Sequence, residues 1–223
     1  ANNAEWIEYG HRFSVMSGQS TADMNDRTAH FAPREKRRID WITSNQVLIV
    51  TNSQVVRLYR FDSINATQSP QAVQISRTSS DYTGYQRQYW LGYRRAYSAN
   101  GWLAHGVQVD WVRTSYGSDG AIQLDMTPYS SDDNSGSSYT DDNNDKYDGT
   151  ILIGRTASDP AAGSHITPTA RGGSASNEWI DVVINNGSFA TNHVPTLTLT
   201  AGSTNALTNP PQEFTAAAVD PHR

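Results

Sequence analysis

The chain has 223 residues, of which 36% are hydrophobic and 10% aromatic, including 6 Trp and 11 Tyr. That aromatic content is typical of a chain that folds, and the length fits one large β domain with a fragment of a second. No apolar run approaches the ~20 residues that a membrane-spanning helix needs, so we expect no membrane span. The chain has no cysteine, which excludes disulfide scaffolds, cysteine nucleophiles and thiolate zinc sites.

Charge is distributed unevenly along the chain. Residues 1–114 carry 13 basic and 9 acidic side chains, a net charge of +4, whereas residues 115–223 carry 4 basic and 13 acidic side chains, a net charge of −9. No basic stripe interleaved with aromatic residues is present, and the acidic half would repel phosphate. We therefore expect no nucleic-acid partner and favour a cation as the partner of the acidic half.

The first third of the chain changes from irregular to regular patterning. Residues 1–31 keep neither a helical nor a strand period, so we expect an irregular segment. Pro33 is followed by strong helix formers, and proline is tolerated in a first helical turn, which predicts one short helix over about 33–41.

From Val47 onward β-branched and aromatic residues gather in short runs with a period of two, bounded by turn residues. This pattern predicts a mainly β fold, a β-sandwich or jelly roll, with an irregular N-terminal segment and one short helix. Residues 51–53 look like a hairpin turn between the first two runs. The predicted strands are 47–50, 55–61, 72–75, 85–97, 106–113, 121–126, 150–154 and 178–184.

The run from Tyr85 to Tyr97 places its tyrosines on one face of the predicted strand. Such a face either fills the core of a sandwich or forms a platform on which sugar rings stack. The pattern alone leaves both interpretations open.

Residues 129–149 form a stretch dense in Ser, Asn and Asp with no periodicity, which predicts a long surface loop. Closely spaced carboxylate oxygens are the ligands that calcium prefers, although no Glu closes an EF-hand pattern. A solvated acidic loop is the alternative to a calcium site. The candidate calcium ligands are Asp132, Asp133, Asp141, Asp142, Asp145 and Asp148.

Motifs of common catalytic sites are absent from the sequence. It contains no HExxH, GxSxG elbow or Walker loop, and no GxGxxG followed by a helix. No two histidines have the i, i+4 spacing that places two imidazoles on one helical face for zinc. We expect each of the six histidines to be structural or exposed.

The N-terminal segment carries a resemblance to a known family. Residues 8–18, EYGHRFSVMSG, resemble the segment E-Y-G-x-x-F-x-V-M-G of secreted bacterial zinc metallopeptidases related to gametolysin and immune inhibitor A. In that family the segment includes the methionine turn beneath the zinc, and Met16 stands at the methionine. His11 and Ser17 depart from the family pattern.

Four further segments resemble that family in the same order along the chain. Residues 30–42 resemble H-F-N-A and K-x-x-L-G-W-L, residues 89–94 resemble Y-W-L-E-Y-R, and residues 124–128 resemble L-L-D-M-T-P. Residues 171–182 resemble the closing strand. The resemblance covers about residues 5–187.

The resemblance implies a secreted or cell-surface zinc metalloendopeptidase acting on protein or peptide substrates. In the family the zinc ligands and general base lie in an HExxHxxGxxH-type helix upstream of the methionine turn. We therefore expect this chain to be a C-terminal part of such an enzyme, without catalytic activity alone. Zinc is expected only in the full-length parent. The resemblance thus implies that the parent protein is the enzyme, and it leaves open whether this chain alone is one.

The final segment looks like the start of an immunoglobulin-like or cadherin-like repeat, with predicted strands at 196–200 and 213–220. We thus expect residues 1–46 to end a zincin-like region, 47–187 to form the β-sandwich, and 188–223 to be a linker with an incomplete Ig-like module. The alternative function is a non-catalytic module that binds carbohydrate or a surface, with an extracellular polysaccharide as partner.

Overall fold

The chain divides into two compact units, residues 1–187 and residues 188–223. The structure, a computed structural model, describes residues 11–16, 30–77, 86–96, 100–114, 121–127, 147–187, 196–201 and 214–219.

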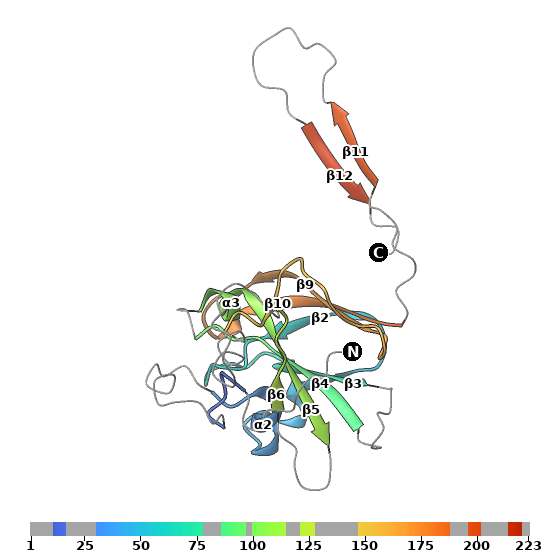
Figure 1. Cartoon of the computed structure of the whole chain (residues 1–223). Coiled ribbons are helices and arrows are strands. Elements are labelled where there is room, and N and C mark those ends of the chain that lie inside the picture. Colours follow the sequence, from blue (N-terminus) through green and yellow to red (C-terminus); the bar gives the residue numbers. More distant parts are fainter. Residues whose placement is uncertain are drawn as a thin grey trace, which may run out of the picture. The chain divides into compact units, whose positions relative to one another are not determined.

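The first unit contains two β-sheets, drawn in Figure 1. The six-stranded sheet has the order β1-β3-β4-β5-β6, with β7 also paired to β5, and the four-stranded sheet has the order β2-β10-β9-β8. The mainly β prediction is therefore confirmed. The strands are β1 (Val47–Val50), β2 (Gln54–Tyr59), β3 (Ala72–Arg77), β4 (Gln86–Gly92), β5 (Gly106–Thr114), β6 (Ala121–Gln123), β7 (Ile151–Leu152), β8 (Ala157–Asp159), β9 (Ser164–Gly172) and β10 (Trp179–Asn186).

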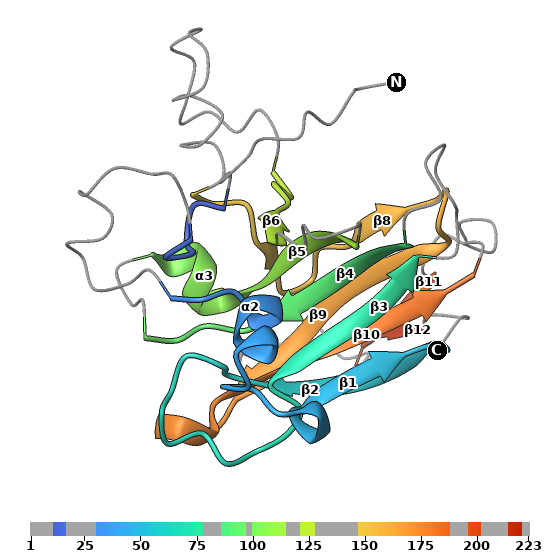
Figure 2. The same ribbon diagram turned by 90° about the horizontal axis from the view of Figure 1, so that it is seen from below.

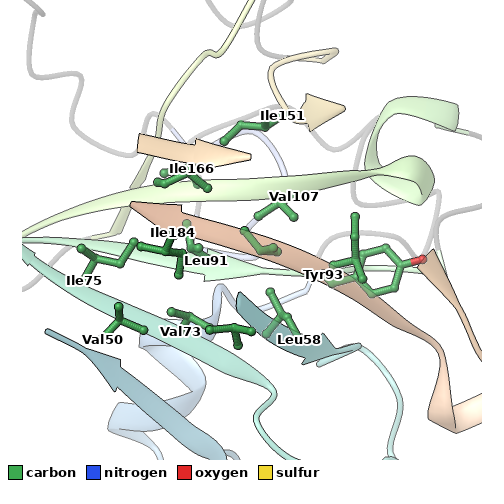
Figure 3. Packing of buried hydrophobic residues seen from close by; sticks show 14 residues of the cluster. Val50, Leu58, Val73, Ile75, Leu91, Tyr93, Val107, Ile151, Ile166 and Ile184 are labelled. Carbon is green, nitrogen blue, oxygen red and sulfur yellow. The ribbon is translucent and has the colours of Figure 1, made fainter. Parts of the chain in front are cut away.

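One apolar core lies between the two sheets, as Figure 3 shows. Alternate residues of each strand point into it, because successive side chains of a strand face opposite sides of a sheet. Full burial of each aliphatic side chain contributes roughly 1.5–3 kcal/mol relative to exposure. The buried members are Val50, Val56, Leu58, Val73, Ile75, Leu91, Tyr93, Val107, Val109, Ile151, Ile166, Ile180, Val182 and Ile184.

A second apolar cluster covers the other face of the six-stranded sheet. Trp90 lies next to Leu91 on β4 but points away from the sandwich core, and it packs with Ala32, Ala72, Val112 and Ala121. Helix α2 (Pro33–Arg38) lies against this outer face, as Figure 2 shows. Both faces of the central strands are consequently buried, the inner face by the second sheet and the outer face by the N-terminal part of the chain.

Helix α2 begins at Pro33, as predicted, but ends at Arg38 rather than near residue 41. Asp40 has a φ of 57°, in the left-handed region that stops a helix. The N–H of Trp41 donates to the carbonyl of Lys36 at 2.9 Å, and the N–H of Asp40 donates to that of Arg37 at 3.4 Å. These two hydrogen bonds form a Schellman motif with Asp40 at the position that usually holds glycine.

A second short helix, α3 (Gly101–His105), was not predicted. Asn100 caps its N-terminus, because the Asn100 Oδ1 accepts hydrogen bonds from the N–H groups of Trp102 and Leu103 at 2.9 and 3.1 Å. Two 3-10 turns, Ser44–Gln46 and Ala175–Asn177, precede β1 and β10. None of the helices in the described part of the chain is long and apolar enough to cross a membrane.

The predicted hairpin at residues 51–53 is wrong. Strand β1 pairs in parallel with β3, with Val47 opposite Ala72, and β2 pairs antiparallel with β10 in the other sheet. Residues 51–53 therefore carry the chain from one sheet to the other. Turn-forming residues occur in such a crossing as well as in a hairpin, so the local sequence does not distinguish a crossing from a hairpin.

The remaining predicted strands match observed ones with shifted ends, but β8 and β9 were not predicted. Strand β9 contains Pro168, which is opposite Val182 at a register shift in the pairing with β10. A proline within a run argues against a central strand unless a bulge accommodates it, and that bulge is not visible in the sequence.

A network of ion pairs joins the two sheets at the ends of β2, β4 and β10. Glu178 binds Arg60 through Oε2 and Arg95 through Oε1, each at 2.8 Å. Asp62 binds Arg60 Nε at 2.8 Å and accepts from the backbone N–H of Arg95 at 2.7 Å. These bonds tie the loop after β2 to the segment that follows β4.

The second unit contains the antiparallel pair β11 (Thr196–Ala201) and β12 (Phe214–Val219). Thr196 is opposite Val219 and Ala201 is opposite Phe214. The prediction of two strands in this region is confirmed.

Candidate functional site

The segment 11–16 is held on the outer face of the six-stranded sheet by a cluster of buried polar side chains. Gln108 and Asp110 are two residues apart on β5, and both contact His11 from the segment, with Gln108 Nε2 at 2.9 Å and Asp110 Oδ1 at 3.0 Å from His11 Nε2. Gln123 on β6 is opposite Asp110 and is also buried. We call His11, Gln108, Asp110 and Gln123 the His11 cluster.

The hydrogen bonds of the His11 cluster converge on one carboxylate oxygen. Asp110 Oδ1 lies 3.0 Å from His11 Nε2 and accepts from Gln108 Nε2 at 2.7 Å. The backbone N–H of Phe13 donates to His11 Nδ1 at 3.2 Å. Since Nδ1 acts as an acceptor, the ring proton is on Nε2, which donates to Asp110. His11 therefore joins its own turn to β5 and is held at both ring nitrogens.

Arg94 connects the segment 11–16 to the residues that precede α2. Its side chain is 2% exposed, and its Nη1 donates to the carbonyl oxygen of Phe13 at 2.8 Å. Its Nη2 lies 3.4 Å from the carbonyl oxygen of His30, whose own N–H donates to the Phe13 carbonyl at 3.1 Å. Burial lowers the pKa of Arg94 to about 10, against the opposing effect of Asp110.

Three basic side chains surround the ring of Phe61. The charged groups of Lys36 and Arg94 lie 5.2 and 5.0 Å from the ring centroid, and the His30 ring packs edge-on at 6.4 Å. Burial, and then the positive charge of Arg94, lower the pKa of Lys36 to about 8. Burial, and then Lys36 and Arg94, lower the pKa of His30 to about 4. This region therefore resists the addition of further positive charge.

Ser14 and Glu35 form a second contact between the N-terminal segment and α2. Ser14 Oγ donates to Glu35 Oε2 at 2.6 Å, and the same carboxylate oxygen accepts from the N–H of Ala32 at 2.7 Å. Ser14 Oγ also accepts from the N–H of Met16 at 3.1 Å. The turn that contains Met16 is thus attached to α2 through a single carboxylate.

The Met16 side chain itself is 54% exposed, so it is not part of either apolar core. The resemblance implies that this methionine lies beneath a zinc ion. Methionine is usually buried in folded proteins. The exposed Met16 side chain therefore contributes little to the packing of the described residues.

Of the candidate calcium ligands, only Asp148 lies within the described residues. It is buried, and its Oδ1 accepts from Thr127 Oγ1 at 2.8 Å. Thr127 also donates from its N–H to Asp125 Oδ1 at 2.8 Å. The remaining candidates, Asp132, Asp133, Asp141, Asp142 and Asp145, lie outside the described residues.

The described residues do not fit a catalytic zinc site. No group of three or more His, Asp or Glu side chains that could hold a metal ion occurs among them. His11 is engaged at both ring nitrogens, and His165 is buried beside the carbonyl of Gly187. His193 and His222 lie outside the described residues. Three protein ligands around an open position are what catalytic zinc requires.

The tyrosine face of β4 belongs to the core. Tyr93 is 1% exposed within the sandwich core, and Tyr89 packs against that core and donates to Asp159 Oδ2 at 2.5 Å. Tyr85 and Tyr97 lie outside the described residues. For the two described tyrosines, the core interpretation of the alternating pattern holds. A more exposed aromatic side chain is Trp41, which packs edge-on against Phe31 after α2.

Sequence reasoning missed Asp110, Gln108 and Arg94 as parts of one site. Asp110 and Gln108 do interrupt an otherwise apolar strand on alternate positions, a pattern that indicates a polar contact on one face. Nothing local identifies His11 as the partner, because 97 residues separate it from Gln108.

Comparison with known proteins adds no relatives. No protein-family model, no curated protein and no solved structure matches this chain.

Proposed function

We propose that this chain is the part of a secreted zinc metalloendopeptidase, of the gametolysin and immune inhibitor A type, that follows the zinc-binding helix. In this proposal it contributes the turn around Met16 and the sandwich that supports it. The substrate of the whole enzyme is a protein or peptide. The zinc ligands and the general base come from residues other than those described here.

The observation that carries the proposal is the backbone of Asp40. The family segment K-x-x-L-G-W-L aligns its glycine with Asp40, and Asp40 has a φ of 57°. That is the conformation which favours glycine, and Asp40 occupies the glycine position of a Schellman motif. The structure of α2 thus supplies a physical reason for a glycine that the resemblance placed there from sequence alone.

The N-terminal end of α2 also agrees with the family segments. The family segment H-F-N-A aligns its asparagine with Ala32, which is the N-cap residue of α2. Asparagine is among the preferred N-cap residues. In this chain Ala32 offers no side-chain acceptor to the first turn, and Glu35 instead binds the N–H of Ala32 itself at 2.7 Å.

Three of the resembling segments also meet in space. Arg94, the last residue of the segment that resembles Y-W-L-E-Y-R, binds the carbonyls of Phe13 and His30, which belong to the first two segments. These segments are therefore parts of one packed region, as expected if they belong to one family motif set.

One position departs from the family for a visible reason. Gly92 aligns with the glutamate of Y-W-L-E-Y-R, but a Cβ atom there would lie 2.6 Å from both Phe61 Cε1 and Pro33 Cγ. In this chain α2 packs too closely on β4 to admit any side chain at that position.

The alternative, a carbohydrate-binding module, has less support. Its proposed platform was the tyrosine face of residues 85–97, and the described tyrosines of that face pack in or against the core. The exposed Trp41 is a single aromatic side chain rather than a platform. An extracellular polysaccharide therefore stays a secondary candidate partner.

The test compares this 223-residue chain with a longer product of its gene that includes an in-frame HExxH motif. Zinc stoichiometry and hydrolysis of casein or gelatin are measured for both. The longer product should bind one zinc ion and hydrolyse protein, whereas the 223-residue chain should do neither, because its described residues offer no three-ligand site. Met16→Ala should impair the longer product and leave the fold of the short chain nearly unchanged.

Either of two results would contradict the proposal. One is zinc-dependent hydrolysis by the 223-residue chain alone. The other is a gene in which no zinc-binding motif precedes these residues. Met24→Ala is a suitable control substitution, because it changes the same residue type outside the resembling turn.

A further inference from the structure

Two buried oxygen atoms of the His11 cluster have no hydrogen-bond partner among the residues that the structure describes. They are Asp110 Oδ2 and Gln108 Oε1, and the two side chains are 0% and 1% exposed. A buried acceptor that remains unsatisfied costs about 1–3 kcal/mol, and native proteins rarely leave two such atoms in one place.

The two oxygens belong to neighbouring side chains on the same face of one strand. Gln108 and Asp110 are two residues apart on β5, and the Gln108 Nε2 donates to Asp110 Oδ1 at 2.7 Å. The contact with His11 confirms that both side chains extend from the outer face of the sheet toward the segment 11–16.

The donors that contact Asp110 converge on one of its two oxygens. His11 Nε2 and Gln108 Nε2 are both directed at Asp110 Oδ1, and the N–H of Phe13 is bonded to His11 Nδ1. Rotation of the Gln108 amide by 180° would let its oxygen accept from His11 Nε2, but it would also place that oxygen against Asp110 Oδ1 and leave Asp110 Oδ2 unsatisfied. None of these donors reaches Asp110 Oδ2 or Gln108 Oε1.

A buried donor is also unsatisfied on Arg94, which interacts electrostatically with Asp110. Arg94 Nε has no hydrogen-bond partner among the described residues, although both terminal nitrogens of the guanidinium lie near backbone carbonyls. Arg94 interacts electrostatically with Asp110, and it binds the carbonyl of Phe13, two residues after His11. One unsatisfied donor and two unsatisfied acceptors thus occur in the same buried layer.

We propose that the His11 cluster binds an internal water molecule, which donates its two hydrogens to Asp110 Oδ2 and Gln108 Oε1. Its lone pairs are then available to the Nε–H of Arg94. Two hydrogens and two lone pairs match the two acceptors and the one donor, and buried waters typically make about three hydrogen bonds.

Local charge argues for a neutral molecule rather than a metal ion. The cations of Arg94 and Lys36 are both buried on this side of the sheet and lie within 5.2 Å of the Phe61 ring centroid. An additional cation would be repelled by both side chains, and Asp110 is the one carboxylate of the His11 cluster that would attract it. A water molecule satisfies the same oxygens without adding charge.

The proposed water would complete the contact between the segment 11–16 and β5. At present that contact depends on Asp110 Oδ1, which binds His11 and Gln108, while Oδ2 is unsatisfied. A water bound to Oδ2 would fix the second oxygen and hence the rotation of the carboxylate to which His11 is bonded. The position of the turn before Met16 would then depend on an internal solvent molecule.

The test is a crystal structure of the whole chain at a resolution that shows ordered water. The expected result is a density peak about 2.7–3.2 Å from both Asp110 Oδ2 and Gln108 Oε1, with a displacement parameter similar to that of its neighbours. A peak at about 2.3–2.6 Å with six or more oxygen neighbours would indicate a calcium ion and overturn the proposal. A direct protein donor at Oδ2, with no peak, would also overturn it.

A solution experiment tests the same site by another route. Long-lived internal water is counted by magnetic relaxation dispersion for the native chain, for Gln108→Met and for the control Gln54→Met at an exposed position. The count should fall by one in Gln108→Met and stay unchanged in Gln54→Met. Equal counts in all three proteins would overturn the proposal. If Gln108→Met does not fold, the crystal structure of the native chain decides whether the water molecule is present.

Discussion

The carbonyl oxygen of Phe13 accepts a hydrogen bond from Arg94 Nη1 at 2.8 Å, although 81 residues separate the two in sequence. Both groups are buried, so neither can exchange this bond for one with solvent. The bond fixes the N-terminal segment to the end of β4. Its removal should therefore affect the stability of the whole first unit.

Arg94→Met is expected to lower the free energy of unfolding by about 1.5–3 kcal/mol, because it removes a buried hydrogen bond from a charged group and leaves the Phe13 carbonyl with only the N–H of His30. Urea denaturation of the native and variant chains measures this difference. Arg57→Met is the matched control, since Arg57 is exposed and pairs with Asp181 on the outer face of the four-stranded sheet. A loss at Arg94 no larger than the loss at Arg57 would contradict the role assigned to Arg94.

Stability should rise with pH between about 4 and 6.5 because of His30. Burial lowers the pKa of His30 from 6.5 to about 4. Within that window the unfolded chain binds a proton that the folded chain does not, so acid favours unfolding. His30→Gln should reduce this dependence on pH, as measured by urea midpoints at several pH values. His105→Gln, which removes an exposed histidine, is the control for the loss of an imidazole.

Gly92→Ala is expected to destabilise the chain by about 1–3 kcal/mol through overpacking. The new Cβ would lie 2.6 Å from Phe61 Cε1 and from Pro33 Cγ, and both belong to well-packed side chains. Gly101→Ala is a control of the same type, because a Cβ at residue 101 meets nothing within 4 Å. Thermal melts compare the two. A Gly92 variant as stable as the Gly101 variant would show that α2 can move away from β4.

Calcium binding stays a prediction from the sequence, with candidate ligands between Asp132 and Asp148. If calcium binds only the folded chain, a concentration of 100 times its Kd should add about 2.7 kcal/mol to the free energy of unfolding. Thermal melts with EGTA and with added calcium measure this effect. Asp141→Asn combined with Asp142→Asn should weaken it, whereas Asp40→Asn, outside the acidic loop, should not. Superimposed melts would rule out a stabilising calcium site.

The sequence predicted those features that depend on local pattern. Strands β1, β5 and β10 have β-branched residues at a period of two, and Pro33 marks the start of α2, so these elements were found close to their observed positions. The end of α2 was missed because it depends on the backbone conformation of Asp40, and aspartate does not identify a left-handed residue as glycine would.

The features that the sequence did not predict depend on partners far along the chain. Strand β9 is stabilised by pairing with β10 in spite of Pro168, and β1 joins β3 rather than the adjacent β2. The His11 cluster combines residues from the N-terminal segment with residues from β5 and β6. No spacing rule relates such residues, since their proximity arises only when the sheet has formed.

The pairing of β2 with β10 has a consequence for the order in which the protein folds. Arg57 is opposite Asp181, 124 residues later, so β2 has no partner in its own sheet until nearly all of the first unit has emerged from the ribosome. Contacts of such long sequence separation form slowly, because loop closure must precede them. During synthesis the apolar residues Val56 and Leu58 therefore remain accessible, and the nascent chain is prone to aggregation for that interval.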